Sequence, residues 1–365
     1  MATPRPRSTF GDQRVDAALT DVLATVGADQ NDDLVRQLLV TALDMDAAGV
    51  DRLDLKIASQ ALAEMLSSWR VFSPHSSRPK ITIFGSARTK PGMPDYELAV
   101  AFGRSMAERN WMAITGAGPG IMTAAIEGAG IDRSFGVNIL LPFEQRAADI
   151  IDGDSKLATF KYFFTRKLTF MKETDAFALF PGGFGTLDEA FELLTLIQTG
   201  KSYPAPIVLL DHPGSTYWSS WRRFVTAELL EGRMVSANDL DLFLHTHDPE
   251  QAAEYVCGFY SCYHSLRFVG KLLVLRLRSS VGPDGLAELN REFADIVVSG
   301  EIEAVEATAA ERRDGDHVEL PRLGFRFDSR SFSRLVQLIH RINALAGGPR
   351  PAPATDLVHD VPDGE

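Results

Sequence analysis

Residues 166–189 read RKLTFMKETDAFALFPGGFGTLDE, and this segment contains the most informative pattern in the chain. Its apolar run, residues 176–180, lies between a charged residue and a Pro-Gly-Gly break, which is typical of a buried strand. Apolar residues after Thr186 recur at helical spacing. The pattern predicts a strand, a glycine-rich turn and a helix N-terminus, where unpaired backbone N–H groups and a partial positive charge suit a phosphate. Glycines at this turn would let the phosphate reach the backbone.

The last residue of the stretch, Glu189, has two interpretations. Thr186-Leu187-Asp188-Glu189 fits a capping box, with Thr186 as the N-cap and Glu189 at the third helical position. In that case Glu189 only satisfies a helix end. The alternative is that its carboxylate takes part in the chemistry of a site at the turn.

The order Pro-Gly-Gly-x-Gly-Thr-x-x-Glu, residues 181–189, resembles the signature of the LOG (Lonely Guy) family. Members of this family are phosphoribohydrolases that activate cytokinins, and bacterial members act on nucleoside 5′-monophosphates. The family also has an Arg-Lys pair on the preceding helix, and Arg166-Lys167 stands at the expected spacing. The resemblance covers about residues 78–262, and the whole chain is similar to the long bacterial form with extensions at both ends.

The resemblance implies a set of site residues. The catalytic pair of the family corresponds to Arg166 and Glu189. The turn that holds the 5′-phosphate corresponds to Gly182, Gly183, Phe184, Gly185 and Thr186. Further substrate contacts are expected after the first strand, in a second glycine-rich turn and at three matching positions: Gly85, Ser86, Gly116, Gly118, Gly120, Met122, Glu144, Lys167 and Thr195. Ala117 replaces a glycine that is typical of the family, and we expect it to narrow the pocket.

Alternating strands and helices predict an α/β fold, a doubly wound Rossmann-like parallel sheet over residues 78–262. The expected strands are 80–84, 111–115, 135–141, 176–180, 207–210 and 242–245, with a polar, irregular stretch from the third strand to about residue 161. Helical patterns precede this core and predict a helical N-terminal extension, residues 1–77. Residues 263–346 predict a small α/β appendage with strands 271–277, 302–307 and 323–327 and helices 284–298 and 331–345, and residues 347–365 predict a disordered tail.

Composition excludes several classes of protein. The 365 residues carry a net charge of −12, and no basic face is indicated, so no nucleic-acid partner is expected. Two cysteines form neither a disulfide framework nor a metal pattern, no apolar run approaches the length of a membrane span, and no secretory signal is visible. We therefore expect a cytoplasmic protein without a membrane partner. The resemblance implies a homo-oligomer, a dimer or larger.

Other motifs carry less weight. The run Gly116–Gly120 resembles a dinucleotide fingerprint, but its third glycine is misplaced by one residue. His245 and His247 would share a face at a strand end, but no further ligands are spaced nearby, so no metal is expected. Lysine decarboxylation, an activity sometimes attached to this family, would need a pyridoxal phosphate lysine that the sequence does not indicate, so no cofactor is expected.

The resemblance, with Arg166, Glu189 and the glycine-rich turn that carry it, implies hydrolysis of the N-glycosidic bond of a nucleoside 5′-monophosphate, AMP or an N6-modified AMP, to the free base and ribose 5-phosphate. Positive charge develops at the anomeric carbon, and a carboxylate such as that of Glu189 can stabilise it. A guanidinium such as that of Arg166 can hold the phosphate or the sugar. The alternative is a non-catalytic nucleotide sensor or carrier on the same fold.

Overall fold

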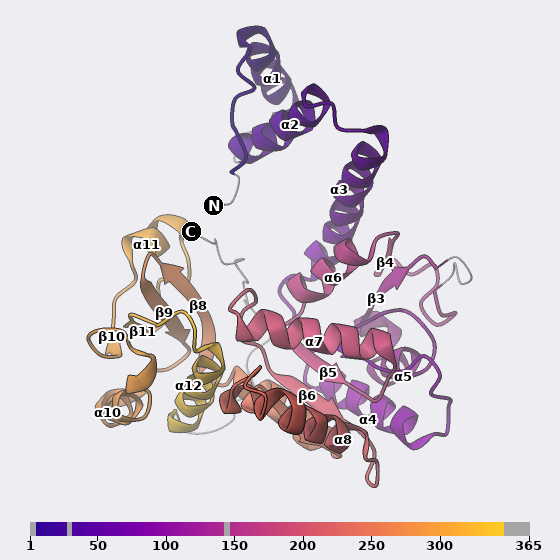
Figure 1. The fold of residues 1–365 in the computed structure, drawn as a ribbon, viewed down its shortest axis with the longest axis vertical. Helices are drawn as coiled ribbons and strands as arrows, with labels where there is room; N and C mark the ends of the chain where they lie inside the picture. Colours follow the sequence, from indigo (N-terminus) through magenta and orange to yellow (C-terminus); the bar gives the residue numbers. More distant parts are fainter. Residues whose placement is uncertain (1–4, 28–30, 142–146, 347–365) are drawn as a thin grey trace. The chain divides into compact units, whose positions relative to one another are not determined.

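The computed structural model describes residues 5–27, 31–141 and 147–346 (Figure 1). Two compact units are distinguished, Met1–Glu64 and Met65–Glu365. The first contains α1 (Gln13–Val26), α2 (Asp32–Ala47) and the beginning of α3 (Arg52–Phe72). Arg36 joins α2 to α1 through an ion pair with Asp16, Nη2 to Oδ1, of 3.2 Å. Many large apolar side chains of this unit are exposed, so its own core is small.

The second unit is built on a seven-stranded sheet in which every pair of neighbouring strands is parallel. The strand order is β4-β3-β2-β1-β5-β6-β7. The strands are β1 (Lys80–Phe84), β2 (Met112–Thr115), β3 (Ser134–Ile139), β4 (Leu157–Phe160), β5 (Ala176–Leu179), β6 (Ile207–Leu210) and β7 (Phe243–Thr246). The chain builds outward from β1 on one side, and then returns to place β5 on the other side of β1. The carboxyl ends of β1 and β5 therefore flank a topological switch point, where open α/β sheets bind ligands.

Helices cover both faces of this sheet, as the doubly wound prediction requires. They are α4 (Pro94–Glu108), α5 (Ile121–Ala129), α6 (Phe163–Lys172), α7 (Phe184–Gln198), α8 (Tyr217–Phe224), which continues as a π-helical turn (Val225–Leu230), and α9 (Pro249–Phe259). Helix α4 packs against α5 and α9. In Figure 1, α7 crosses in front of β5, whereas α4 and α5 lie behind the sheet. The strands between these layers are almost entirely buried.

The end of α3 belongs to this unit and packs on the sheet. The Phe72 ring stacks on Phe135 of β3 with centroids 4.5 Å apart. The buried hydroxyls of Ser68 and Thr169, the latter on α6, lie 3.2 Å apart. The first contact joins α3 to the sheet, and the second joins it to α6, the helix that carries Arg166.

The C-terminal segment, residues 263–346, forms a second sheet of antiparallel pairs in the order β10-β11-β9-β8. Its elements are β8 (Tyr263–Val269), β9 (Leu272–Leu277), α10 (Gly282–Glu292), β10 (Glu303–Ala304), α11 (Ala309–Asp314), β11 (Arg322–Phe325) and α12 (Phe332–Leu345). Elsewhere in the second unit, short 3₁₀ turns occur at Ser73–His75, Ile131–Arg133 and Ala237–Asp241, and the C-terminal segment contains one at Ala294–Ile296. The core continues from the parallel sheet into this segment.

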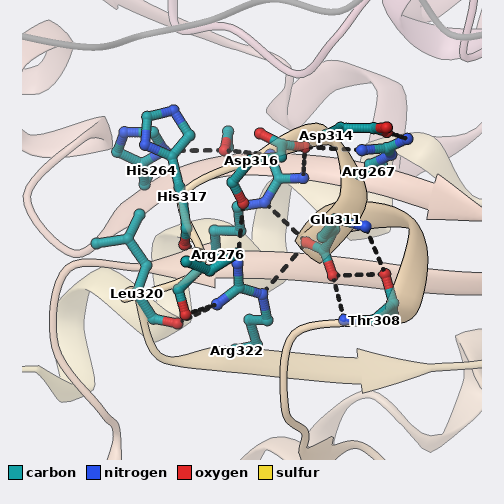
Figure 2. A network of polar contacts seen from close by, with 12 residues as sticks. His264, Arg267, Arg276, Thr308, Glu311, Asp314, Asp316, His317, Leu320 and Arg322 are labelled. Carbon is teal, nitrogen blue, oxygen red and sulfur yellow. Dashed lines mark hydrogen bonds and ion pairs between the residues drawn. The ribbon is translucent and has the colours of Figure 1, made fainter.

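A buried polar network holds the loop around α11 to this second sheet (Figure 2). One oxygen of Glu311 accepts hydrogen bonds from Nε of Arg276 at 3.0 Å and Nε of Arg322 at 3.2 Å. Its other oxygen accepts bonds from the backbone and the hydroxyl of Thr308, both at 2.9 Å. Burial alone would raise the pKa of Glu311, but these hydrogen bonds outweigh burial and lower it. The network is fully paired and structural.

Three expectations about elements were wrong. The polar stretch before residue 161 contains a strand, β4, which extends the sheet beyond β3. Strand β8 was not expected and pairs with β9. Helix α7 begins at Phe184, not after Thr186, because Phe184 and Gly185 already take helical geometry. The predicted tail, residues 347–365, lies outside the described residues.

Among the helices of the described residues, none combines the length and apolar character that crossing a bilayer requires.

Candidate active site

A pocket of about 730 Å³ opens at the carboxyl ends of β1 and β5. This volume is in the range typical of small-molecule sites. Its walls come from the turn after β1, residues 84–88, and from the turn and first residues of α7, residues 182–189. Side chains of α5, α6 and α8 complete it. The pocket therefore occupies the switch point that the strand order predicts.

Backbone hydrogen bonds fix the turns around the pocket. The N–H of Ser86 donates to the carbonyl of Pro181 at 3.0 Å, which joins the turns after β1 and β5. The N–H of Ile121 donates to the carbonyl of Ser86 at 3.1 Å. The Tyr217 hydroxyl donates to the carbonyl of Gly182 at 2.6 Å. The walls are therefore preorganised for a ligand.

The glycines of the Pro-Gly-Gly turn have different roles. A Cβ atom on Gly182 would lie 2.1 Å from Oγ1 of Thr186, so the packing of the turn requires glycine there. A Cβ on Gly183 or Gly185 would meet no protein atom within 4 Å. These two positions border the pocket, and their lack of a side chain leaves space for a ligand against the backbone.

The capping-box interpretation of Glu189 was wrong. Gly183 is the N-cap of α7, and no side chain makes a capping hydrogen bond. Thr186 lies inside the first turn, where its side chain packs against Gly182. The first N–H groups of α7 thus remain available to an anion in the pocket.

Glu189 is a buried carboxylate on the pocket wall. It is only 6% exposed, and its Oε2 atom is buried without a hydrogen-bond partner. Burial raises the pKa of Glu189 to about 7, although the nearby Lys167 and Arg166 oppose the shift. Nζ of Lys167 lies 3.8 Å from Oε2. An unsatisfied, buried and perturbed acid in a pocket is a candidate for chemistry.

Arg166 is held rigidly beside the same pocket. Its Nε donates to the carbonyl of Val137 at 2.8 Å, and its Nη2 donates to that of Gly116 at 3.3 Å. The guanidinium carbon lies 5.2 Å from the centre of the Phe170 ring. Burial lowers the pKa of Arg166 to about 10 and the charge of Glu189 opposes this, so the arginine stays cationic at neutral pH. A Cβ on Gly116 would lie 2.6 Å from Nη2, so the guanidinium requires glycine there.

Lys167 is not among the residues that line the pocket, and its side chain pairs with α7. Its Nζ pairs with Asp188 at 2.9 Å and also with Glu192 and Glu189. Burial disfavours the charged lysine, but these carboxylates outweigh it and raise the pKa of Lys167. Lys167 therefore joins α6 to α7.

The structure brings most of the predicted residues into one pocket. Eleven of them line it: Gly85, Ser86, Gly116, Met122, Arg166, Gly182, Gly183, Phe184, Gly185, Thr186 and Glu189. Four do not line it: Gly118, Gly120, Lys167 and Thr195. The Thr195 hydroxyl instead donates to the carbonyl of Phe191 on its own helix at 2.7 Å. Glu144 lies outside the described residues.

Two residues of the second turn serve its packing. Gly120 has φ of +74°, and a Cβ there would lie 2.3 Å from the carbonyl oxygen of Ser86. Ala117 is fully buried in a small apolar cluster with Ile126 and Ile151. Its methyl group therefore does not narrow the pocket, contrary to expectation.

Sequence reasoning missed several pocket residues, of which Arg88 and Tyr217 matter most. Arg88 follows the Gly-Ser turn after β1 and is exposed at the pocket. Its position at the carboxyl end of the first strand was a usable signal, since ligands bind at this edge. Tyr217 begins α8 and reaches the pocket only through the fold, so no local pattern indicates it.

Comparison with known proteins identifies the family of the chain. A family model described as "Possible lysine decarboxylase" matches residues 120–256. Cytokinin riboside 5′-monophosphate phosphoribohydrolase LOG7 of Arabidopsis thaliana is 31% identical over 161 residues, which cover 42% of this chain and 70% of LOG7. The chain belongs to the LOG family. LOG4 of the same plant is 29% identical over 101 residues, which cover 28% of this chain and only 45% of LOG4, less than half its length.

The LOG-family chain also resembles a solved structure. The molybdenum cofactor binding protein from Rippkaea orientalis is 19% identical with a TM-score of 0.34, and the match covers 48% of this chain and 94% of that one.

Proposed function

We propose that this LOG-family protein hydrolyses the N-glycosidic bond of a nucleoside 5′-monophosphate, AMP or an N6-modified AMP. The products are the free base and ribose 5-phosphate. One observation carries the proposal: the buried carboxylate of Glu189, with an unpartnered oxygen, shares a pocket with the fixed guanidinium of Arg166. The names of LOG7 and LOG4 support the same class of substrate.

The phosphate would bind at the start of α7. Gly183 and Gly185 leave the backbone open there, and the helix N-terminus supplies N–H groups and partial positive charge. Arg88 at the facing turn adds a cation within the same pocket. Binding energy from the phosphate would then hold the sugar beside Glu189.

The bond that breaks joins the anomeric carbon of the ribose to a nitrogen of the base. Positive charge develops on the sugar as the base leaves, and the ionised Glu189 would stabilise this charge. Water then adds to the anomeric carbon, and the departing base takes up a proton. Arg166, fixed by Val137 and Gly116, would keep the substrate aligned with the carboxylate.

Base release tests the proposal. Purified protein is incubated with AMP, N6-isopentenyl-AMP and other nucleoside monophosphates, and the free bases are separated by chromatography. We expect base and ribose 5-phosphate in equal amounts, at a rate that rises with pH through about 7 as Glu189 ionises. Glu189→Gln keeps the side-chain volume and should lower the rate at least about 100-fold.

Glu192→Gln is the matched control. Glu192 lies on the same helix and also pairs with Lys167, but it does not line the pocket. Its variant should retain nearly the wild-type rate. If no monophosphate releases a base while calorimetry still detects nucleotide binding, the protein is a sensor or carrier and the hydrolase proposal is wrong.

A further inference from the structure

A second group of chemically capable side chains lies outside the pocket. Within residues 5–27, 31–141 and 147–346, one set of three metal-binding side chains converges: Asp211, His245 and His247. One possible ligand atom from each lies within 4.8 Å of the others. None of the three lines the pocket that holds Glu189. Asp211, which directly follows β6, is a third possible ligand that the spacing along the sequence did not indicate.

The register of the parallel sheet brings these residues together. Leu209 of β6 stands opposite His245 of β7. Two residues further on, beyond the end of β6, Asp211 comes beside His247. Asp211 and His247 lie just beyond the ends of β6 and β7, and the contacts of Asp211 with both histidines show that the three side chains meet. A partner 34 residues earlier in the chain cannot be recognised from local spacing.

The distances suit a small cation. Oδ1 of Asp211 lies 2.9 Å from Nε2 of His245 and 2.9 Å from Nδ1 of His247. Tetrahedral zinc with bonds of about 2.0–2.1 Å keeps its ligand atoms about 3.3 Å apart. A small outward movement of the two imidazoles would therefore admit the ion. Without an ion, Nε2 of His245 can donate a hydrogen bond to Oδ1 of Asp211 at 2.9 Å, and Nδ1 of His247 can donate one to the backbone carbonyl of Asp211, also at 2.9 Å.

Charge also favours a cation here. The side chain of Asp211 is 0% exposed, and its ion-pair partners among the described residues are the two histidines. The N–H of Trp218 is close to its other oxygen, Oδ2, at 3.4 Å. A buried carboxylate is costly unless a positive charge lies close to it. A divalent ion would compensate this charge.

We propose that Asp211, His245 and His247 bind a divalent transition-metal ion, with Zn²⁺ as the first candidate. Two imidazole nitrogens and one carboxylate oxygen are a known ligand set for such ions. The side chain of His247 is 44% exposed, so the remaining coordination position opens to water. The bound ion would join the ends of β6 and β7.

Direct binding to the full chain, produced without a histidine tag and stripped with a chelator, tests this proposal. Zn²⁺ is titrated in by calorimetry, and thermal unfolding is followed with and without the ion. We expect one ion per chain and a higher unfolding temperature with Zn²⁺. His247→Gln, at a half-exposed position that tolerates change, should weaken binding at least about tenfold and remove the thermal shift.

His212→Gln is the matched control. His212 is the next residue after Asp211, but its ring contacts the carbonyl of Pro213 instead. This variant should bind Zn²⁺ like the wild type. Equal binding by wild type and His247→Gln, or no saturable binding of one ion, would leave only a hydrogen-bonded Asp–His cluster and overturn the proposal. Neither readout depends on nucleotide hydrolysis.

Discussion

The side chain of Glu189 lies in surroundings that do not favour its charged form. Its carboxylate is buried, and Oε2 has no hydrogen-bond partner. A cationic partner, Lys167, lies near it but bonds more closely to Asp188 and Glu192 on the surface of α7. A residue that served only stability would not be held in this way. The arrangement is typical of active sites, where a residue needed for catalysis lowers the stability of the folded protein.

The free-energy cost of burying the Glu189 carboxylate predicts how Glu189→Gln changes stability. The pKa of Glu189 in the folded protein is about 7, above its ordinary value of 4.5, so the folded state favours the protonated form. The stabilisation is fully present below pH 4.5 and is lost as pH rises through about 7. Glutamine stays neutral, so the variant should match the wild type near pH 4.5 and exceed it by up to about 3 kcal/mol at pH 8.

Urea unfolding at several pH values measures this difference. Glu192→Gln serves again as the control, because Glu192 is paired and only partly buried. It should show no gain that grows with pH. A Glu189→Gln variant less stable than the wild type at pH 8 would mean that the carboxylate is well solvated or well paired.

At the residue scale, the sequence predicted pocket residues within its recognisable motifs, but not those that distant elements bring to the pocket. Arg166 and Lys167 are consecutive on a helix, and consecutive residues point about 100° apart. Arg166 lines the pocket, whereas Lys167 is not among the lining residues and pairs with Asp188 of α7. Arg88 and Tyr217 come from other elements, so their positions depend on the tertiary fold. The roles of the site residues stay predictions.

At the scale of elements, buried strands with strong apolar runs could be predicted, and weak ones could not. Strand β1 reads KITIF and is buried along its whole length. Strand β4 reads LATF, lies at the sheet edge, and has one exposed and one half-buried residue, so its apolar signal is weak. Strand β8 mixes polar and apolar residues, so its apolar pattern was also too weak to predict a strand. The doubly wound topology was nevertheless confirmed.

The turn before α7 gives a prediction at this scale. Gly185 is the second residue of α7, and a methyl group added there would meet no protein atom within 4 Å. Alanine there should leave the fold intact and raise stability by about 0.5–1 kcal/mol, since alanine is the better helix former. The methyl group would keep a phosphate from the backbone, so kcat/KM for AMP should fall at least about 100-fold.

Gly182→Ala separates packing from binding. A methyl group there would collide with Thr186, so this variant should lose stability as well as activity. Thermal unfolding and base release are measured on both variants. Unchanged kcat/KM in Gly185→Ala would show that no phosphate approaches this turn.

At the scale of the second unit, the C-terminal segment supports the helix that carries Glu189. Helix α12 packs against α7. A Cβ on Gly200, just after α7, would lie 2.0 Å from the ring of Phe332, so the two segments meet closely. Gln198 at the end of α7 donates to Asp239 at 2.6 Å, and Asp239 also accepts a hydrogen bond from Ser333 of α12. The sequence predicted this segment but not its contacts, since they join residues far apart in the chain.

Assembly gives the last prediction, because α6 leaves large apolar side chains uncovered beside the pocket. Phe164 is 55% exposed and Leu168 is 49% exposed, and Phe184 at the start of α7 is 94% exposed. Phe164 and Leu168 are four residues apart on α6 and so share one face, and exposed apolar surface on one face is a candidate contact with another protein. We expect a homo-oligomer that buries this surface, with a mass at least twice the 40.0 kDa of one chain.

Light scattering after size-exclusion chromatography measures that mass. Leu168→Glu should shift the protein toward the monomer, because burying an unpaired carboxylate in an interface is costly. Met234→Glu is the control, since Met234 is 71% exposed on the segment after α8 and distant in sequence from α6. This variant should keep the wild-type mass. A wild-type monomer at micromolar concentration, or an oligomer unaffected by Leu168→Glu, would show that α6 is not the contact surface.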